Sequence, residues 1–186
     1  MPEPHLPDLP LAELHLPDEN ATDRLGAALA ARVTVGTVVG LNGELGAGKT
    51  RLVRAIALAC GVEAAEIGSP TFTLVREYRT GIADPADSSA PFTPPPLLFH
   101  LDAYRLSDEV DYLNLGPDEF LETGAMLIEW ANRVSDVLPT DRLTLTLTAT
   151  GETSRRVQFA VGGPRSTALL DELMKEEAIR GFAHAR

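Results

Sequence analysis

The sequence predicts an α/β fold in which a central sheet, mixed but mostly parallel, lies between two layers of helices and ends in an antiparallel hairpin. An apolar run at residues 38–41 leads into a glycine-rich loop and then a helical pattern, which is the order strand, turn, helix. Two further apolar runs, at 97–101 and 125–128, each end at a carboxylate. Segments 142–147 and 156–161 alternate between apolar and polar residues, as the strands of a hairpin do.

The glycine-rich loop is an uninterrupted G-x-x-x-x-G-K-T motif, Gly43-Glu44-Leu45-Gly46-Ala47-Gly48-Lys49-Thr50. Glycines allow positive φ, and consecutive backbone N–H groups before a helix N-terminus form a concave anion site. In such a phosphate-binding loop (P-loop), Lys49 reaches the β- and γ-phosphates and the Thr50 hydroxyl binds Mg²⁺. The strand before it and the helix after it favour this interpretation over a turn that binds nothing. The predicted architecture is therefore a P-loop NTPase-like three-layer sandwich.

Composition limits the classes of function. The chain has 186 residues, of which 44% are hydrophobic and 23% charged, and a formal net charge of −11. Direct binding to nucleic acid is disfavoured, because it needs clustered Lys and Arg. Cys60 is the single cysteine, so no internal disulfide is possible, and we expect it in the core. No apolar stretch approaches the ~20 residues of a membrane span and no secretory signal is evident, so we expect a cytoplasmic protein without a membrane contact.

Proline content divides the chain. We expect a flexible leader over residues 1–15, a single P-loop ATPase domain over 16–180 and a tail over 181–186. The proline-rich segment 80–96 cannot form a strand ladder. We therefore predict that it is a long disordered or mobile hairpin loop, which follows a strand that ends near Tyr78.

Apolar spacing predicts the helices outside this loop. One helix is expected over 20–32, with Asp18 or Asn20 as its N-cap. The helix after the P-loop is expected to stop at Gly61. A terminal helix from about residue 167 to 179 is expected to pack on the sheet.

Carboxylates at two strand ends are candidates for holding a metal. A nucleotide with Mg²⁺ needs a carboxylate at a strand end in addition to the P-loop. Asp102 fits this Walker B role, and Glu129 is the second candidate, as a metal ligand or to orient the attacking water. The alternative for each is that it caps the helix that follows.

Four other residues have two interpretations each. Thr71 lies where GTPase-like folds place a switch threonine that follows the γ-phosphate, or it is an ordinary turn hydroxyl. Trp130, the only tryptophan, packs on a nucleotide or partner, or is a core indole. His100, inside an apolar strand, is more typical of a satisfied core histidine than of a base. Arg105 reaches phosphate or forms a surface ion pair.

Five motifs in a fixed order resemble the TsaE family, also called YjeE, the small P-loop ATPases of bacterial tRNA threonylcarbamoyladenosine synthesis. The resemblance covers residues 16–161. Its motifs are Leu16-Pro17-Asp18-Glu19 with Ala21-Thr22 and Leu25-Gly26, the P-loop, Ser69-Pro70-Thr71-Phe72-Thr73-Leu74-Val75, His100-Leu101-Asp102-Ala103-Tyr104-Arg105-Leu106 and Ile128-Glu129-Trp130.

The resemblance implies an ATPase that uses ATP and Mg²⁺ and acts with homologues of TsaD and TsaB, and that meets tRNA only indirectly through that complex. It implies that Lys49 contacts the phosphates, that Thr50 and Glu129 bind Mg²⁺, that Asp102 lies near the metal and that Thr71 is the switch. Pro17 and Glu19 are expected near the base, and Asn132 near the phosphate or metal. The full expected nucleotide-binding set is Pro17, Glu19, Gly43, Glu44, Leu45, Gly46, Ala47, Gly48, Lys49, Thr50, Arg51, Trp130 and Asn132.

The chain departs from the family pattern at three places. Ala131 stands where the family often has proline, Arg51 stands where a second threonine is frequent, and the 80–96 loop is longer than usual. An alternative function is a small-molecule or nucleotide kinase that uses the same loop. Kinases usually add a lid rich in arginine, and the sequence has no such segment. A third hypothesis is a nucleotide-dependent binding module whose hydrolysis is incidental.

Overall fold

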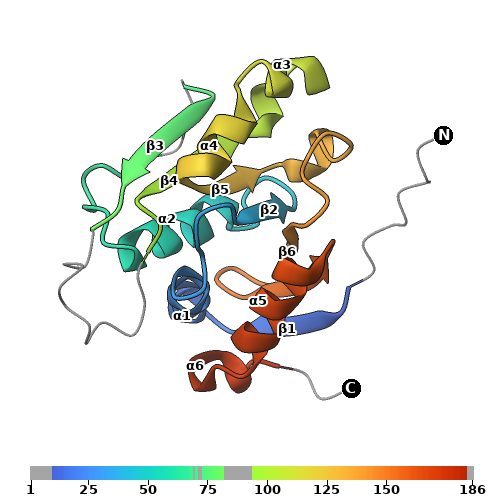
Figure 1. Ribbon diagram of the computed structural model, residues 1–186. Helices are drawn as coiled ribbons and strands as arrows, with labels where there is room; N and C mark the ends of the chain where they lie inside the picture. Colours follow the sequence, from blue (N-terminus) through green and yellow to red (C-terminus); the bar gives the residue numbers. More distant parts are fainter. Residues whose placement is uncertain (1–9, 69, 71–72, 82–93, 184–186) are drawn as a thin grey trace.

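The computed structural model describes residues 10–68, 70, 73–81 and 94–183. Seven strands form one sheet in the order β1-β7-β6-β2-β5-β4-β3 (Figure 1). The strands are β1 (Ala12–Leu16), β2 (Val38–Asn42), β3 (Val75–Arg79), β4 (Leu97–Asp102), β5 (Gly124–Glu129), β6 (Leu143–Ala149) and β7 (Arg155–Val161). The helices are α1 (Glu19–Ala30), α2 (Lys49–Ala59), α3 (Glu109–Leu113), α4 (Pro117–Thr123), α5 (Pro164–Met174) and α6 (Glu177–Arg180), with 3₁₀ turns η1 (Ala103–Arg105) and η2 (Ala131–Arg133).

The mixed sheet and its C-terminal hairpin confirm the predicted α/β fold. The four central strands β6, β2, β5 and β4 are parallel. The pairs β1–β7, β7–β6 and β4–β3 are antiparallel and flank this centre on both sides. The parallel strands therefore form the centre of the sheet. Their carboxyl ends lie at the same edge, where β2 leads into the P-loop.

Both faces of the sheet are buried, which produces the three layers. In β5, Ala125 and Leu127 belong to a hydrophobic cluster with residues of α1, α2, α5 and α6, whereas Met126 and Ile128 belong to a cluster with residues of α3 and the 3₁₀ turns. Successive side chains of a strand point to opposite faces, so a strand covered on both sides needs an unbroken apolar run. Figure 1 shows α3 and α4 on one side of the sheet and α1, α5 and α6 on the other.

The first strand corrects the predicted leader. Residues 12–16 pair with β7, and Leu14 and Leu16 are buried, so the prediction of a flexible segment over 1–15 is wrong from Ala12 onward. The expected tail also contacts this strand, because the His15 N–H donates to the Phe182 carbonyl at 2.8 Å. The physical reason is that one short amphipathic strand completes the sheet edge beside β7. Residues 1–9 and 184–186 lie outside the described residues.

Two predicted helices have different ends from those expected. α1 starts at Glu19, and of the two candidate N-caps it is Asp18 whose carboxylate accepts the Ala21 N–H at 2.8 Å. The expected single terminal helix is divided into α5 and α6. Glu176 between them has an extended ψ of 122°. Its carboxylate accepts a hydrogen bond from Arg32 at 2.7 Å, so the residue at the break between the two helices is bound to a residue distant in sequence.

The ends of the predicted 80–96 loop are held by hydrogen bonds. The Thr80 N–H donates to the Pro96 carbonyl at 3.2 Å and its hydroxyl donates to the Pro95 carbonyl at 2.6 Å. The antiparallel pairing of β3 with β4 confirms the hairpin, while residues 82–93 of its loop lie outside the described part of the chain. None of the helices described here combines the length and the apolar character that a membrane span requires.

Helices α1 and α2 approach closely at Gly26. A Cβ built there would lie 2.3 Å from Cβ of Ala55. We expect Gly26→Ala to lower the free energy of unfolding by about 1–3 kcal/mol through overpacking, although alanine favours a helix over glycine by about 1 kcal/mol. Urea unfolding followed by circular dichroism measures this. Gly181→Ala is the control, because no atom lies within 4 Å of its Cβ. Equal unfolding midpoints for the two variants would contradict the close approach.

Cys60 is buried, and burial raises the pKa of its thiol to about 12. The thiolate is the reactive form of cysteine. We therefore expect no reaction with a disulfide reagent such as DTNB at mildly alkaline pH in the folded protein, and complete reaction in denaturant. Rapid labelling of the folded protein would show that the thiol is accessible.

Candidate nucleotide-binding site

The P-loop and the two candidate carboxylates meet at one edge of the sheet. In the sheet register Glu129 pairs with Leu41 on one side and with Asp102 on the other. The carboxyl ends of the parallel strands β2, β4 and β5 meet at this edge. Ligands of α/β proteins bind beyond the carboxyl ends of such strands. A pocket of about 450 Å³ lies there, lined by Leu45, Gly46, Gly48, Lys49, Thr50, Arg51, Asp102, Tyr104, Arg105, Glu129 and Trp130.

Three glycines give the loop a backbone that other residues rarely adopt. Gly43 has φ 135°, Gly46 has φ 79° and Gly48 has φ 103°. A Cβ on Gly43 would lie 2.3 Å from the Leu147 carbonyl oxygen of β6, so the loop can pass this strand only with a glycine. Gly48 is the N-cap of α2, and the positive end of the helix dipole therefore faces the pocket.

The side chain of Lys49 is buried, with 4% of its surface exposed. Its Nζ donates to the carbonyls of Gly43 at 2.7 Å and Glu44 at 2.9 Å. It also lies 3.8 Å from the centroid of the Trp130 ring. Burial lowers the pKa of Lys49, and the nearby carboxylates of Glu129 and Asp102 oppose this change. The hydrogen-bond acceptors of this ammonium are neutral carbonyls, so an anion in the pocket would be a stronger partner.

Trp130 has φ 57° and is the one non-glycine residue with positive φ in the described part of the chain. Such a conformation costs of order 1–3 kcal/mol and is found most often at functional sites. Here the chain turns from β5 into η2, and the indole lies between Lys49 and the Tyr104 ring, whose centroid is 5.0 Å away. The ring packs on the cluster beneath α3 and also lines the pocket, and its contact with a nucleotide or a partner stays a prediction.

Thr50 and Glu129 offer two oxygen ligands side by side. The Thr50 hydroxyl donates to Oε2 of Glu129 at 2.9 Å, and Oε1 of Glu129 lies 2.8 Å from Nε2 of His100. Mg²⁺ usually takes one or two protein oxygens together with substrate phosphates. Within the described ranges no group of three or more His, Cys, Asp or Glu side chains forms a metal site by itself. The residues therefore fit an ion shared with a bound phosphate.

Asp102 and Thr71 are the two other residues predicted to take part in catalysis. Oδ1 of Asp102 accepts the Tyr104 N–H at 3.1 Å and caps η1, which is the alternative that its sequence position left open. Its side chain also lines the pocket, and its metal role stays a prediction. Thr71 lies outside the described residues, and its role as a switch stays a prediction too.

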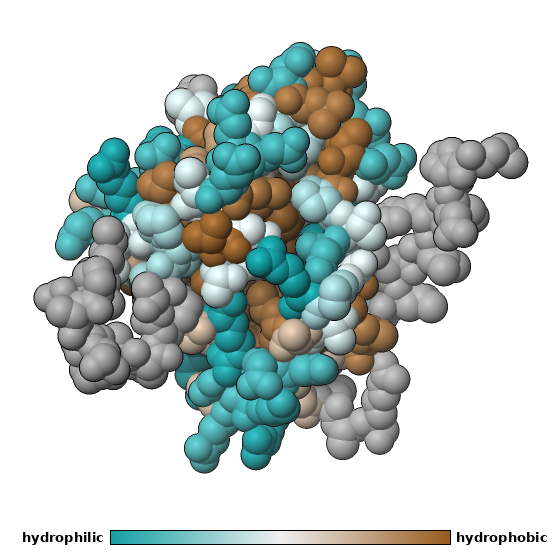
Figure 2. Space-filling model, in the orientation of Figure 1, coloured by the Kyte–Doolittle hydropathy of each residue, from teal (hydrophilic) through white to brown (hydrophobic). Residues whose placement is uncertain are grey.

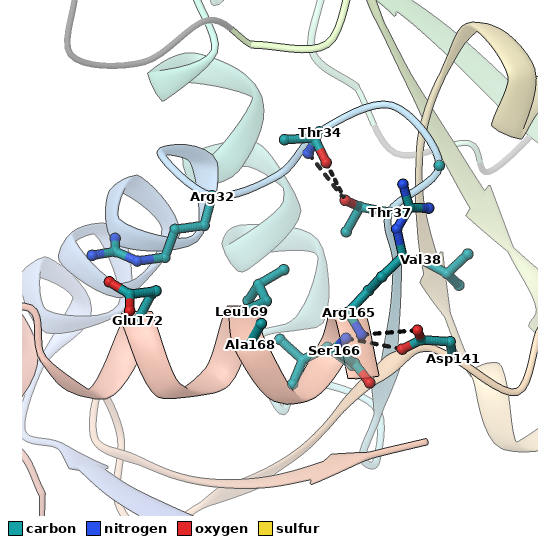
Figure 3. A pocket seen from close by; sticks show the side chains of 12 residues that line it. Arg32, Thr34, Thr37, Val38, Asp141, Arg165, Ser166, Ala168, Leu169 and Glu172 are labelled. Atoms are coloured by element: carbon teal, nitrogen blue, oxygen red, sulfur yellow. Dashed lines mark hydrogen bonds between the residues drawn. The ribbon is translucent and has the colours of Figure 1, made fainter. Parts of the chain in front are cut away.

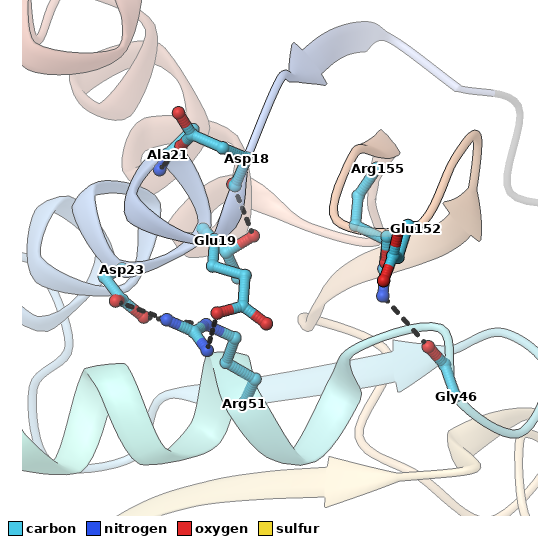
Figure 4. Close-up of polar contacts among 9 residues, drawn as sticks. Asp18, Glu19, Ala21, Asp23, Gly46, Arg51, Glu152 and Arg155 are labelled. Carbon is cyan, nitrogen blue, oxygen red and sulfur yellow. Dashed lines mark hydrogen bonds and ion pairs between the residues drawn. The ribbon is translucent and has the colours of Figure 1, made fainter.

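Arg51 ties the helix after the P-loop to α1. Its guanidinium donates to Asp23 at 2.7 Å and lies 2.9 Å from Oε2 of Glu19 (Figure 4). Arg51 lines the pocket, whereas Pro17, Glu19 and Asn132 are not among its lining residues. The backbone N–H of Asn132 donates to Oδ1 of Asn42 at 2.9 Å. Nucleotide contacts of these residues stay predictions.

Arg155 fastens the P-loop from outside the pocket, a contact that sequence reasoning missed. Its Nε donates to the Ala47 carbonyl at 2.9 Å and its Nη2 to the Gly46 carbonyl at 3.3 Å (Figure 4). Its Nη1 donates to carbonyls of the β6–β7 turn, at Gly151, Glu152 and Ser154. No local pattern could have indicated this role, because Arg155 and Ala47 are 108 residues apart.

A second cavity, of about 350 Å³, lies at the other end of β2, where Val38 lines it (Figure 3). Several of its polar groups have structural partners. Arg32 donates to Glu176 at 2.7 Å, and the Asp141 carboxylate accepts the backbone N–H groups of Arg165 and Ser166, each at 2.9 Å. The cavity contains none of the predicted site residues, so the P-loop pocket is the candidate site.

Known proteins resemble this chain over most of its length. The family model described as "Threonylcarbamoyl adenosine biosynthesis protein TsaE" matches residues 16–157. The relative of that name from Bacillus subtilis is 33% identical over 159 residues, which are 85% of this chain and 90% of the relative. The relative from Synechocystis is 41% identical over 128 residues, 66% of this chain and 71% of its own.

A solved structure supports the same assignment. The crystal structure of Bacillus subtilis YdiB superposes with a TM-score of 0.64 and 27% identity, and the match covers 88% of this chain and 93% of that one. The P-loop, both strand-end carboxylates and Arg155 lie within the residues that the family model matches. The chain therefore belongs to the TsaE family of tRNA threonylcarbamoyladenosine biosynthesis proteins.

Proposed function

We propose that this protein is the ATP-binding and ATP-hydrolysing subunit required for the threonylcarbamoyladenosine modification of tRNA, at the adenosine next to the anticodon, and that it acts in the cytoplasm through a TsaD–TsaB complex. The observation that supports this most directly is the arrangement of Lys49 and Thr50. The Lys49 ammonium is held inside the P-loop by two carbonyls, next to the hydrogen-bonded pair of Thr50 and Glu129. A lysine, a hydroxyl and a carboxylate are the groups with which P-loop NTPases hold a nucleotide and Mg²⁺.

Phosphate binding would use groups that the fold already orients. Residues of the loop and of the first turn of α2 line the pocket, and backbone N–H groups at a helix N-terminus bind anions. Lys49 would exchange its bonds to the carbonyls of Gly43 and Glu44 for bonds to phosphate oxygens, because a phosphate adds the attraction of an opposite charge, which a carbonyl lacks. Trp130 would remain as the wall of the pocket next to this ammonium.

Glu129 has the central place in the proposed hydrolysis. With Thr50 it would hold Mg²⁺, or it would orient the attacking water, and Asp102 ends the neighbouring strand within the same pocket. Bound Mg²⁺ would neutralise the charge that develops on the phosphoryl oxygens. Transfer of a phosphoryl group depends mainly on positioning and charge stabilisation. We therefore expect the protein without its partners to hydrolyse ATP slowly, because the attacking water is not yet fully oriented.

A protein partner would complete the site. Two apolar side chains at the pocket are exposed, Leu45 to 92% and Tyr104 to 58%. Figure 2 shows that apolar residues also gather near α3, where Val110 and Leu113 are exposed. Exposed apolar groups that cluster are typical of interaction sites. The net charge of −11 suits a protein partner better than direct contact with tRNA.

The proposal is tested by phosphate release from Mg-ATP, measured for the wild type and Lys49→Ala, each alone and with TsaD and TsaB homologues from the same cell. We expect the partners to stimulate the wild type, and the variant to lose about 100-fold or more of this rate, because it lacks a charged group on the transferred phosphate. A rate that the partners do not change would contradict the proposal. Phosphorylated acceptor in place of free phosphate would identify the alternative, a small-molecule or nucleotide kinase.

The role of Arg155 gives a second test of the site. Arg155→Met removes two hydrogen bonds to P-loop carbonyls and three to the β6–β7 turn. The two to the P-loop are each worth about 0.5–1.5 kcal/mol, so we expect the variant to lose at least about 1–3 kcal/mol of stability and to bind ATP more weakly, as measured by calorimetry. Arg156→Met on the same strand is the control with the same change of charge. Equal dissociation constants for the two variants would show that Arg155 does not hold the loop.

A further inference from the structure

A diagonal row of buried polar side chains crosses the sheet next to the site. Tyr78 of β3, His100 of β4 and Glu129 of β5 lie on the face that α2 covers. In the register His100 pairs with Arg76 of β3 and with Leu127 of β5. Tyr78 and Glu129 are each two residues further along their strands, so they are diagonal neighbours of His100 on the same face.

Short polar contacts connect this row from the P-loop helix to the residue Gly68. Oε2 of Glu129 accepts from Thr50 at 2.9 Å, and Oε1 lies 2.8 Å from Nε2 of His100. The Tyr78 hydroxyl lies 3.4 Å from Nδ1 of His100 and donates to the Gly68 carbonyl at 2.7 Å. A carboxylate only accepts hydrogen bonds, so His100 donates its Nε2–H to Glu129.

Because these side chains are buried, each polar group depends on its protein partner. His100 is 1% and Tyr78 is 3% exposed, so water cannot replace a missing partner. Burial also raises the pKa of Tyr78, and its hydroxyl therefore keeps the proton that it donates to Gly68. With Tyr78 fixed by Gly68, the imidazole has a fixed neighbour on one side and the carboxylate on the other. Two donors on different oxygens then define the plane of the Glu129 carboxylate.

We propose that His100 is a positioning residue: its imidazole, supported by Tyr78, holds the Glu129 carboxylate so that Oε2 stays beside Thr50 and can share Mg²⁺ with a bound nucleotide. The inference rests on the proposed function, because it requires that Mg²⁺ strengthens ATP binding. A leucine at position 100 would fill a similar volume but would leave Oε1 of Glu129 without its donor. Groups that orient a metal ligand in this way typically contribute 10–100-fold to metal affinity or activity.

The test is the Mg²⁺ concentration that gives half of the full gain in ATP affinity, measured by calorimetry over a series of Mg²⁺ concentrations and with EDTA. For His100→Leu we expect this concentration to rise by about 10–100-fold, while ATP affinity in EDTA stays within about twofold of the wild type, because the P-loop contacts are unchanged. For His100→Gln, whose amide N–H can replace Nε2–H, we expect most of the wild-type behaviour to return.

Two further variants separate positioning from packing. Leu98→Ala changes a buried residue of the same strand and the same face, and we expect it to destabilise the fold without changing the Mg²⁺ requirement. Tyr78→Phe keeps the ring but removes the hydroxyl, and we expect a smaller shift in the same direction as His100→Leu. It also serves as the test if His100→Leu does not fold.

The outcomes separate the inference from the proposed function. An unchanged Mg²⁺ requirement in His100→Leu or, if that variant does not fold, in Tyr78→Phe would overturn the inference. A shift as large in Leu98→Ala, or in His100→Gln, would overturn it as well. A wild-type protein whose ATP affinity does not respond to Mg²⁺ would contradict the proposed function itself.

Discussion

The site depends on the burial of two opposite charges at one edge of the sheet. Lys49 and Glu129 are 4% and 5% exposed, and burying an ion is costly unless hydrogen bonds replace its water. Each charge has its own partners: two carbonyls and an indole face for Lys49, and a hydroxyl and an imidazole for Glu129. Both charges thus remain available to the pocket that they line.

The sheet topology explains how these partners come together. The parallel centre brings the ends of β2, β5 and β4 to one edge, and the antiparallel strands add support on both sides of it. On one flank β3 provides Tyr78, which contacts His100. On the other, the β6–β7 hairpin provides Arg155, which holds the outer side of the P-loop. The hairpin is therefore part of the architecture of the site as well as of the sheet.

Sequence patterns predicted the features that depend on residues close together in the sequence. The P-loop, the apolar strands on both sides of it and the carboxylates at strand ends are contiguous signals, and the structure places Glu129 beside Thr50. The strand Ala12–Leu16 was missed because five alternating residues directly after a proline-rich stretch are too short a signal, and only pairing with β7 gives them structure. The break before α6 and the partners of His100 and Arg155 depend on residues far apart in the chain, which single-sequence patterns do not record.

The place of Trp130 has a consequence for how the protein can be observed. It is the only tryptophan in the chain, and its ring lies 3.8 Å from the ammonium of Lys49. Indole emission responds to a charge held close to the ring. Any event that draws Lys49 away from Trp130 therefore changes the emission of a single, defined fluorophore, and the protein carries its own optical reporter of what its lysine contacts.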